Sequence, residues 1–555
     1  MSPGKLVDPR PSLVFVTDTA THHGGQLALE ALLRVEPGLD TLFTLSGGHI
    51  FPLLDAAHAL GWRIIDVRHE QTAVFAAEGM AKATRSPGLA ALTAGPGVTN
   101  GVSALTGAFL NGSPLLVLAG RAPQHRWGAG SLQELDHVPI VRSVCKRAVT
   151  ATDTAAIPAE VLEAWRASTS PHRGPSFVDL PLDVLGGHAE TPDLTALKPE
   201  APVTSGDLDL AASLLSRAER PVLVAGSDLY FAHGEQALLE LAETSRLPVF
   251  ANGLGRGLLA ADHELAFSRA RPLWKQADLV VVVGAPLDFR LGFGRFEGAE
   301  IVHVVDSPER RAAHAETACT IVGDLRVVLE QLAARTEPAS MKEEWLARLR
   351  ETERARREAE RVELESDTDP IHPARVYGEL GRRLERDAVV IGDGGDFVSY
   401  AGRLVDSYQP GCFLEPGPYG CLGSGLGYSI AARLAHPDRQ VVACFGDGAF
   451  GFSAMDVDTL VRHRLPVVMV LGNNGIWGLE KHPMRFFYGY DVAADLRQET
   501  RYDEIVAALG GAGETVSSPS ELGPALDRAF DSGVPYLVNV LTDPAVSYPR
   551  TANLA

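Results

Sequence analysis

The chain has 555 residues, 45% of them hydrophobic, and its 70 acidic and 50 basic side chains leave a net charge of −20. This length predicts about three domains with sizeable cores, and the acidic balance argues against general nucleic-acid binding. No run of eighteen apolar residues is free of polar breaks, so we expect no membrane span.

Five cysteines are scattered along the chain without metal-ligand spacing. This usage is typical of reduced, mostly buried thiols. The first residues, MSPGKLVDPRPSLVF, lack the apolar core of a signal peptide. We therefore expect a cytoplasmic protein.

Apolar runs typical of buried strands alternate with helical patterns along the chain, which predicts an α/β fold of doubly wound parallel-sheet domains. The first unit spans about residues 20–190, and a stretch rich in Gly, Pro and Ser, about 186–206, is predicted to be a linker. A second unit follows at 207–340. A highly charged segment, 341–369, is predicted to be a solvated helical linker, and 370–550 form the last unit.

Each unit contains four strand-like runs. In chain order they are LDTLFTLS, RIIDVRH, LAALTAG and SPLLVLAG, then RPVLVAG, LPVFANG, ADLVVVVGAP and EIVHVVD, and finally DAVVIGDGG, RQVVACFGDG, PVVMVLGNN and PYLVNVL. The first and last units resemble each other, since both contain a strand, a Gly-rich turn, a helix and a strand. A duplication would explain this similarity, and so would the order of strand, turn, helix and strand that α/β folds generally share.

The last unit contains a candidate site for a metal and a diphosphate. Asp447, between Gly446 and Gly448, is followed by a predicted helix and strand and then by Asn474. Carboxylate and amide oxygens suit Mg²⁺, which completes its shell with water and phosphates, and glycines let backbone amides approach those phosphates. Such a site is expected at the carboxyl edge of a parallel sheet. The simpler alternative is that both motifs are ordinary turns.

Two neighbours complete this candidate site: Ala449 with the diphosphate-binding glycines, and Ile476 with the metal ligands. In the first unit, Glu70 follows a strand and opens a helix. An acid at that position is often only a favourable partner of the helix dipole.

Taken together, the motifs resemble those of thiamine-diphosphate (ThDP) enzymes of the acetolactate synthase, benzaldehyde lyase and 2-hydroxyacyl-CoA lyase (or oxalyl-CoA decarboxylase) group, over about residues 25–545. The matching segments are SGGH (46–49), RHE (68–70), AAEGMAK (76–82), TAGPGVTN (93–100), SLQE (131–134), LGSGLG (422–427), GDG (446–448) and NN (473–474). The resemblance implies a pyrimidine-binding domain, a central Rossmann-like domain and a diphosphate-binding domain.

The resemblance also implies roles for individual residues. Glu70 would hydrogen-bond N1′ of the aminopyrimidine and favour the imino tautomer, which takes the C2 proton of the thiazolium. Leu422 would be the apolar wedge that bends the cofactor, with Gly420 at the pyrimidine edge. The turn Gly394-Gly395-Asp396 would approach the diphosphate from the other side.

Relatives build each active site between two subunits, so the resemblance implies a homodimer or homotetramer. Glu70 would come from one chain, and Asp447 with Asn474 from the other.

Three pocket residues bear on the substrate. His49 matches a His of benzaldehyde lyase and is suited to moving protons, although it is equally suited to capping a helix. Gln133 matches a Gln of acetolactate synthases and benzaldehyde lyase, and the resemblance implies that it would hydrogen-bond a substrate oxygen. Glu480 matches an acid of pyruvate decarboxylases, and the alternative is a solvent-facing Glu paired with Lys481 or a neighbour.

In relatives the central domain holds a nucleotide, and the resemblance leaves open whether it does so in this chain. Acetolactate synthases bind FAD there through a Gly-Ala-Arg run, and Pro286 replaces that Arg, which argues against FAD. Relatives that act on CoA thioesters bind ADP or the CoA nucleotide instead. Arg256, Arg271 and Arg290 are candidates for a diphosphate, with surface ion pairs as the alternative.

The sequence favours an acetolactate synthase-like carboligase that uses a 2-ketoacid such as pyruvate. His49 and Pro286 favour a lyase or carboligase of acyloins or 2-hydroxyacyl-CoA instead. A non-catalytic regulatory subunit is disfavoured because Glu70, Asp447 and Asn474 are all present. A nicotinamide dehydrogenase is disfavoured because neither outer unit opens its first helix with GxGxxG.

Overall fold

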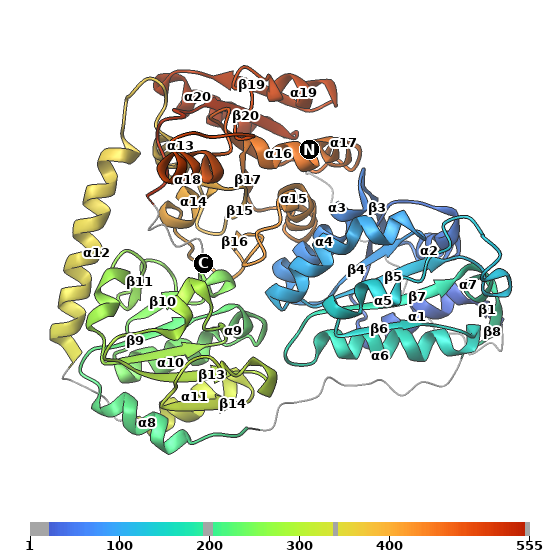
Figure 1. Cartoon of the computed structure of the whole chain (residues 1–555), viewed down its shortest axis with the longest axis horizontal. Helices are drawn as coiled ribbons and strands as arrows, with labels where there is room; N and C mark the ends of the chain where they lie inside the picture. The colour runs from blue at the N-terminus through green and yellow to red at the C-terminus, as the bar shows by residue number, and fades with distance from the viewer. Residues whose placement is uncertain (1–20, 192–203, 337–341, 550–555) are drawn as a thin grey trace, which may run out of the picture.

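The computed structural model describes residues 21–191, 204–336 and 342–549, which form three α/β domains (Figure 1). The predicted linker at 186–206 falls largely on residues 192–203, outside the described residues, as do the first twenty residues and the predicted domain ends at 20, 341 and 550. Each domain is built on a six-stranded sheet in which all strand pairs are parallel. The predicted fold class is confirmed.

The N-terminal domain has the strand order β3-β2-β4-β5-β7-β6. Its strands are β2 (Thr41–Thr44), β3 (Arg63–Asp66), β4 (Gly88–Leu92), β5 (Leu115–Arg121), β6 (Arg147–Thr150) and β7 (Pro175–Pro181). Its helices are α1 (Gly24–Val35), α2 (Phe51–Ala59), α3 (Glu70–Thr84), α4 (Pro96–Asn111), α5 (Val138–Val141), α6 (Ile157–Thr169) and α7 (Leu182–Gly186). A separate antiparallel pair joins β1 (Thr21–His23) to β8 (His188–Glu190).

The central domain has the strand order β11-β10-β9-β12-β13-β14. Its strands are β9 (Pro221–Ala225), β10 (Val249–Ala251), β11 (Ala266–Phe267), β12 (Leu279–Val283), β13 (Glu300–Val305) and β14 (Cys319–Val322). Its helices are α8 (Leu208–Arg217), α9 (Ser227–Phe231), α10 (Glu235–Ser245) and α11 (Leu325–Arg335). All residues of β12, LVVVV, are buried, as expected for a central parallel strand covered on both faces.

The C-terminal domain has the strand order β16-β15-β17-β18-β20-β19. Its strands are β15 (Val389–Asp393), β16 (Phe413–Leu414), β17 (Val441–Gly446), β18 (Val468–Asn473), β19 (Ala512–Val516) and β20 (Tyr536–Leu541). Its helices are α13 (Pro373–Gly381), α14 (Asp396–Leu404), α15 (Ser424–Ala435), α16 (Asp447–Ser453), α17 (Val457–Arg462), α18 (Gly478–Tyr488), α19 (Tyr502–Ala508) and α20 (Pro519–Asp531).

The two outer domains share one topology. Numbered within each domain, both sheets have the order 2-1-3-4-6-5, whereas the central sheet has the Rossmann order 3-2-1-4-5-6. The sequence similarity between the outer units therefore corresponds to equivalent elements: β4, α4 and β5 in one domain, and β17, α16, α17 and β18 in the other.

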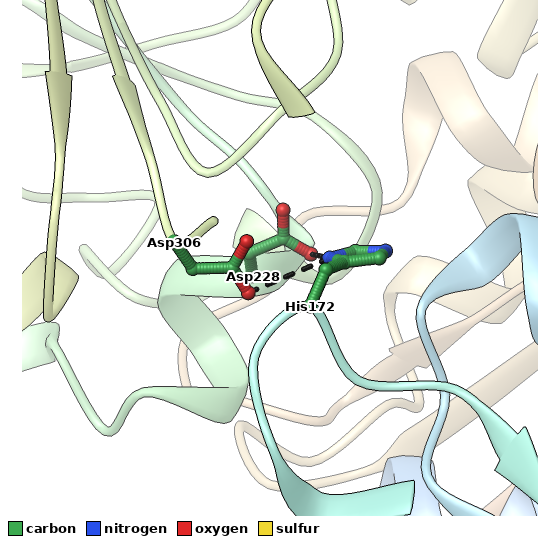
Figure 2. Close-up of side chains that lie close together, drawn as sticks. All are labelled: His172, Asp228 and Asp306. Atoms are coloured by element: carbon green, nitrogen blue, oxygen red, sulfur yellow. Dashed lines mark ion pairs between the residues drawn. The ribbon is translucent and has the colours of Figure 1, made fainter. Parts of the chain in front are cut away.

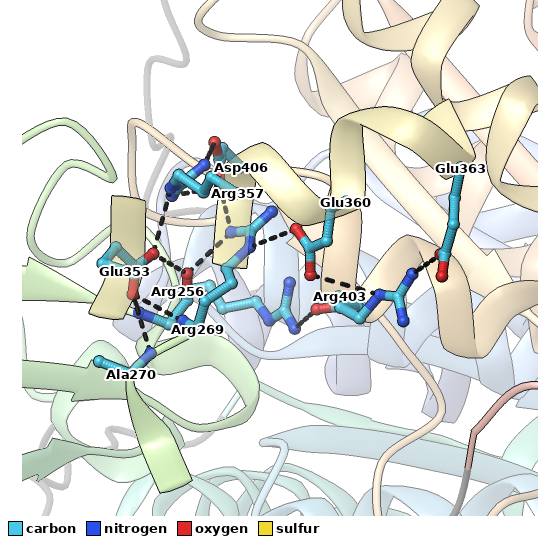
Figure 3. A network of polar contacts seen from close by, with 11 residues as sticks. Arg256, Arg269, Ala270, Glu353, Arg357, Glu360, Glu363, Arg403 and Asp406 are labelled. Carbon is cyan, nitrogen blue, oxygen red and sulfur yellow. Dashed lines mark hydrogen bonds and ion pairs between the residues drawn. The ribbon is translucent and has the colours of Figure 1, made fainter. Parts of the chain in front are cut away.

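The charged segment after the central domain forms the long helix α12 (Glu343–Leu364), which runs along one side of the molecule (Figure 1). It differs from the expected solvated helix, because Trp345, Leu346 and Leu349 are buried against the central domain. Polar contacts extend this interface toward the C-terminal domain (Figure 3).

A carboxylate of α12 is the centre of that polar network. Glu353 accepts hydrogen bonds from the consecutive backbone amides of residues 268–270, at 2.7 to 3.1 Å. Asp406, in the C-terminal domain, binds Arg269 of the central domain and Arg357 of α12, each at 2.8 Å (Figure 3). The helix thus fastens two domains to each other through ion pairs and backbone contacts.

The outer domains meet through α3 and α15, the equivalent helices that follow the second strand of each sheet. Their backbones approach closely: a Cβ on Gly79 would lie 2.9 Å from Tyr428 Cα, and one on Gly427 would lie 2.7 Å from Phe75 Cβ. Between the helices, Tyr428 donates to Glu78 at 2.7 Å.

Lys82 completes this buried polar cluster. Its Nζ lies 2.9 Å from Tyr428 Oη and 3.0 Å from Glu78 Oε1, and it also donates to the Glu415 carbonyl. Both charged side chains are at most 2% exposed. A buried charge pair requires such complete pairing, so these contacts fix how the two domains pack.

All five cysteines are free thiols and four of them are buried, as predicted. Burial raises the pKa of Cys145 and of Cys444 to about 12. No helix in the described part of the chain has the length and apolarity needed to span a membrane.

Replacing Gly427 by Ala is expected to lower the free energy of unfolding by about 1–3 kcal/mol, because the new methyl group overlaps α3. Gly107→Ala in α4 is the matched control. Its Cβ would lie 3.9 Å from the nearest atom outside its own helix backbone, so it should be neutral or stabilising by about 0.4–1 kcal/mol. Urea unfolding measures both, and equal stabilities would contradict the close packing.

Candidate active site

The strand order of the N-terminal sheet reverses between β2 and β4, and α/β sheets bind ligands outside the carboxyl ends of their strands at such a point. The chain leaves β2 into Leu45–His49 and leaves β4 into Thr93–Gly95. Glu70 begins α3 soon after β3, which pairs with β2. Three of the sequence motifs therefore converge at one edge.

Glu70 is 7% exposed and lies beside the loop after β4. Asn100 Nδ2 donates to Glu70 Oε2 at 3.0 Å. A Cβ on Gly97 would lie 3.7 Å from Glu70 Oε1. Among the described residues Glu70 has no ion-pair partner, so a neutral amide holds its carboxyl group in place.

His49 and Gln133 lie around the same loop. His49 Nδ1 is 3.4 Å from Thr93 Oγ1, and Gln133 packs on Gly95, whose added Cβ would lie 2.9 Å from Gln133 Cβ. Burial lowers the pKa of His49, opposed by a hydrogen bond with the backbone of Leu132. Burial therefore favours the neutral imidazole.

The C-terminal sheet reverses at the equivalent place, between β15 and β17. Asp447 begins α16 at the end of β17, and Asn474 follows β18. Asp447 accepts backbone N–H groups of Gly448 and Gly475, both at 2.9 Å, while burial raises its pKa to about 6. Asn474 Oδ1 accepts the N–H of Ile476 at 3.2 Å.

Several backbone segments lie close together beside Asp447 and Asn474. Gly394 has φ of +137°, and a Cβ there would lie 2.9 Å from the Gly446 amide nitrogen. A Cβ on Gly448 would overlap the Trp477 ring at 2.5 Å, whereas one on Gly446 would meet open space. With Ala449 in the first turn of α16, this arrangement leaves room above Gly446 for a phosphate near backbone amides.

The two residues that follow Gly394 make contacts of different kinds. A Cβ on Gly395 would meet Leu479 Cδ1 at 2.8 Å. The Asp396 carboxylate accepts the backbone N–H of Tyr548 at 3.0 Å and lies beside Gly478. The side chain of Asp396 thus fixes the C-terminal segment, and only the backbone of this turn is placed toward Gly446.

The loop before α15 carries Gly420 and Leu422. Gly420 has φ of +66° and open space where a Cβ would be. The Leu422 carbonyl accepts Gln71 Nε2 at 3.3 Å, which links this loop to the start of α3. Asp393, which the sequence analysis did not single out, accepts the backbone N–H of Gly423, whose nitrogen lies 3.2 and 3.1 Å from the two carboxylate oxygens.

The two groups form separate half-sites, and no hydrogen bond or ion pair between described residues joins Glu70 to Asp447. Their donor sets fit the predicted ligands: buried carboxylate and amide oxygens for a divalent cation, an open glycine cradle for a diphosphate, and a buried carboxyl group for a ring nitrogen.

Three family models match the chain. They are the N-terminal TPP binding domain of thiamine pyrophosphate enzymes at residues 22–140, the central domain at 208–332 and the C-terminal TPP binding domain at 393–540. The chain belongs to the thiamine pyrophosphate enzyme family. It is a ThDP-dependent enzyme, as the motifs predicted.

The relatives divide into two activities by name. The chain is 54% identical to a "Probable acetolactate synthase" of Mycobacterium bovis and to the "Acetolactate synthase large subunit IlvG" of Mycobacterium tuberculosis, over 97% of this chain and 100% of each relative. It is 33% identical to "2-hydroxyacyl-CoA lyase 2" of Homo sapiens, over 95% of this chain and 91% of the relative.

Glu480 lies in the first turn of α18 with its side chain exposed. Lys481, which was considered as an ion-pair partner of Glu480, pairs instead with Asp491 at 3.2 Å and also with Asp495. A catalytic role for Glu480 stays a prediction. Within the described residues of a single chain its side chain is exposed to solvent.

The three candidate arginines of the central domain do not act as one group. Arg290 is held by Asp288 in three side-chain contacts of 2.7 to 3.1 Å. Arg256 and Arg271 line a cavity of about 660 Å³ between the central and C-terminal domains. Burial lowers the pKa of both cavity arginines. FAD or ADP in this domain stays a prediction.

The sequence analysis also did not identify the residues that hold the loop after β4 in place. The imidazole of His137, fully buried, accepts the Gly95 N–H at 2.9 Å and bonds Asp179 Oδ1 at 2.9 Å. Asp179 lies in β7 and is also fully buried, so burial raises its pKa. An isolated His and Asp 42 residues apart give no local signal, because only the fold brings them together.

His137→Ala is expected to destabilise the protein by about 1–3 kcal/mol, because it leaves the Gly95 amide and the Asp179 carboxylate without this partner. In a protein that already carries Asp179→Asn, His137→Ala should lower the free energy of unfolding by less, and the difference is a coupling energy of about 0.5–3 kcal/mol. Urea unfolding of the double-mutant cycle measures it. Asp136→Asn, at an exposed ion-pair partner of Arg121, is the control and should cost less than about 1 kcal/mol. Strictly additive costs would contradict the pairing.

Proposed function

We propose that this enzyme is an acetolactate synthase-like carboligase, which decarboxylates a 2-ketoacid such as pyruvate and joins the remaining acyl group to a second carbonyl compound. The observation that carries the proposal is 54% identity along the whole chain to proteins named acetolactate synthases. The retained Glu70, Asp447 and Asn474 support it.

Thiamine diphosphate, when bound, supplies the nucleophilic carbon for this chemistry. Glu70, buried beside Asn100, is placed to hold or release one proton at a ligand nitrogen. His49, whose neutral form is favoured by burial, is suited to exchange a proton with a substrate oxygen, and Gln133 to orient that oxygen. The buried walls of this half-site keep bulk water from Glu70.

We further propose that Mg²⁺ binds Asp447, Asn474 and the backbone of Ile476. The donor set supports this, since hard oxygens from a carboxylate and an amide suit Mg²⁺ better than softer metals. A bound cation would also hold the Asp447 carboxylate ionised against the burial that raises its pKa.

A homodimer or homotetramer with active sites between subunits is the proposed assembly. Large apolar side chains are exposed beside both half-sites: Phe51 at 60% and Leu132 at 78% near His49 and Gln133, and Phe452 at 59% in α16, the helix that Asp447 begins. Exposed apolar surface that flanks a polar site is typical of an interface.

A lyase of 2-hydroxyacyl-CoA is the second candidate. It is favoured by His49, by Pro286 in place of the expected Arg, and by 33% identity to human 2-hydroxyacyl-CoA lyase 2.

Incubation of the enzyme with ThDP and Mg²⁺ on pyruvate, benzoin and a 2-hydroxyacyl-CoA in parallel distinguishes these functions by mass spectrometry. We expect acetolactate and CO₂ from pyruvate, with one CO₂ for each acetolactate. Aldehyde released from benzoin or the thioester, with pyruvate inert, would assign the enzyme to the lyases.

Glu70→Gln should reduce turnover by about 10²- to 10⁴-fold, because an amide cannot exchange the required proton. The substitution keeps the acceptor for Asn100, so ThDP affinity, measured by fluorescence titration, should change little. Glu235→Gln is the matched control, since Glu235 is also the first residue of a helix, α10. An equal loss of turnover in both variants would show that the effect is not specific to Glu70 and would contradict its proton-transfer role.

A further inference from the structure

Three potential ligand side chains meet where the N-terminal and central domains touch (Figure 2). His172 lies in the loop between α6 and β7. Asp228 lies in α9, just after β9, and Asp306 directly follows β13. The two acids thus lie at the carboxyl edge of the central sheet, and the histidine comes from another domain. None of the three belongs to the half-sites described above.

The cluster lacks hydrogen bonds that its burial would require. His172 Nδ1 is 3.4 Å from Asp228 Oδ1 and 3.4 Å from Asp306 Oδ2. Asp306 is 3% exposed, yet neither of its carboxylate oxygens has a hydrogen-bond partner among the described residues. The same is true of both ring nitrogens of His172. Buried polar atoms without partners are rare, and a bound ion is one arrangement that would satisfy them.

The position of the imidazole is fixed by its surroundings. Gly112 ends α4 with φ of +65°, and a Cβ there would lie 2.5 Å from His172 Cε1 and 2.7 Å from Nε2. The ring is therefore packed against this helix end, which leaves Nδ1 toward the two carboxylates (Figure 2).

Neighbouring cations do not satisfy the cluster. Arg173 and Arg310 lie within electrostatic range of both Asp228 and Asp306. Neither donates a hydrogen bond to these carboxylates among the described contacts. They offset part of the acidic charge and leave the Asp306 oxygens available.

The spacing suits a metal ion. The three ligand atoms all lie within 4.8 Å of one another. Around a tetrahedral Zn²⁺ with bonds of about 2.0–2.1 Å, neighbouring ligand atoms are about 3.4 Å apart, which is the separation of His172 Nδ1 from each carboxylate oxygen. A nitrogen ligand favours Zn²⁺ and similar transition-metal ions over Mg²⁺ or Ca²⁺.

We propose that His172, Asp228 and Asp306 bind a divalent transition-metal ion such as Zn²⁺, which fastens the N-terminal domain to the central domain. Water fills the remaining coordination position. The site is structural and distinct from the proposed Mg²⁺ site at Asp447, so it does not depend on the proposed function.

The test uses the full-length protein with Asp447→Asn, so that the diphosphate site does not contribute, after removal of metal by a chelator. Zn²⁺ is added, free ion is removed by gel filtration, and bound zinc is measured by elemental mass spectrometry. We expect one zinc per chain, a rise in the thermal midpoint on binding, and visible d–d bands of a four-coordinate site when Co²⁺ replaces Zn²⁺.

Asp306→Asn, which keeps the shape of the side chain, and His172→Gln should each lose the bound zinc, the thermal shift and the Co²⁺ bands. His125→Gln, at an exposed histidine paired with Asp183, is the matched control and should retain all three. Circular dichroism checks that each variant is folded. Zinc absent from the parent protein, or equally bound in Asp306→Asn and His172→Gln, would overturn the proposal.

Discussion

The packing of α3 on α15 is the constraint on which the catalytic architecture depends. Close backbone approach at Gly79 and Gly427, and the buried Glu78–Lys82–Tyr428 cluster, permit essentially one alignment of the two helices. Glu70 begins α3, and the loop of Leu422 precedes α15. The same contact that joins the outer domains therefore determines where Glu70, the proposed proton-transferring acid, and Leu422, the predicted wedge, lie. The hydrogen bond from Gln71 to Leu422 links their two segments.

Both half-sites follow from one topological rule applied twice. Each outer sheet has the order 2-1-3-4-6-5, so each has a reversal of strand order beside its first strand, the place where α/β sheets bind ligands. In the N-terminal domain Glu70 and His49 lie at this edge, and in the C-terminal domain Asp447 and Asn474 do. The supporting groups differ: His137 with Asp179 holds the loop of Gly95, whereas Asp393, whose pKa burial raises to about 7, holds the loop of Gly423.

The sequence predicted the fold class and the twelve strongest strands, because continuous apolar runs such as that of β12 mark buried parallel strands. It did not predict β11 and β16, which are two residues long, or β7, whose run is interrupted by Asp179. Asp447 and Asn474 were identifiable from a local motif and its spacing, and Glu70 from the resemblance to ThDP enzymes. His137, Asp179 and the His172 cluster were not, because tertiary structure alone brings them together. The buried face of α12 was missed because charged residues dominate its composition.

The central claim is that a catalytic centre is formed by the Glu70 half-site of one subunit and the Asp447 half-site of another. Co-expression of Glu70→Gln with Asp447→Asn chains tests it, since each variant alone should be inactive. If the site is shared, mixed dimers contain one intact centre, and random pairing should restore about a quarter of wild-type turnover. A mixed preparation no more active than the separate variants would contradict the claim and place both half-sites of each centre in one chain.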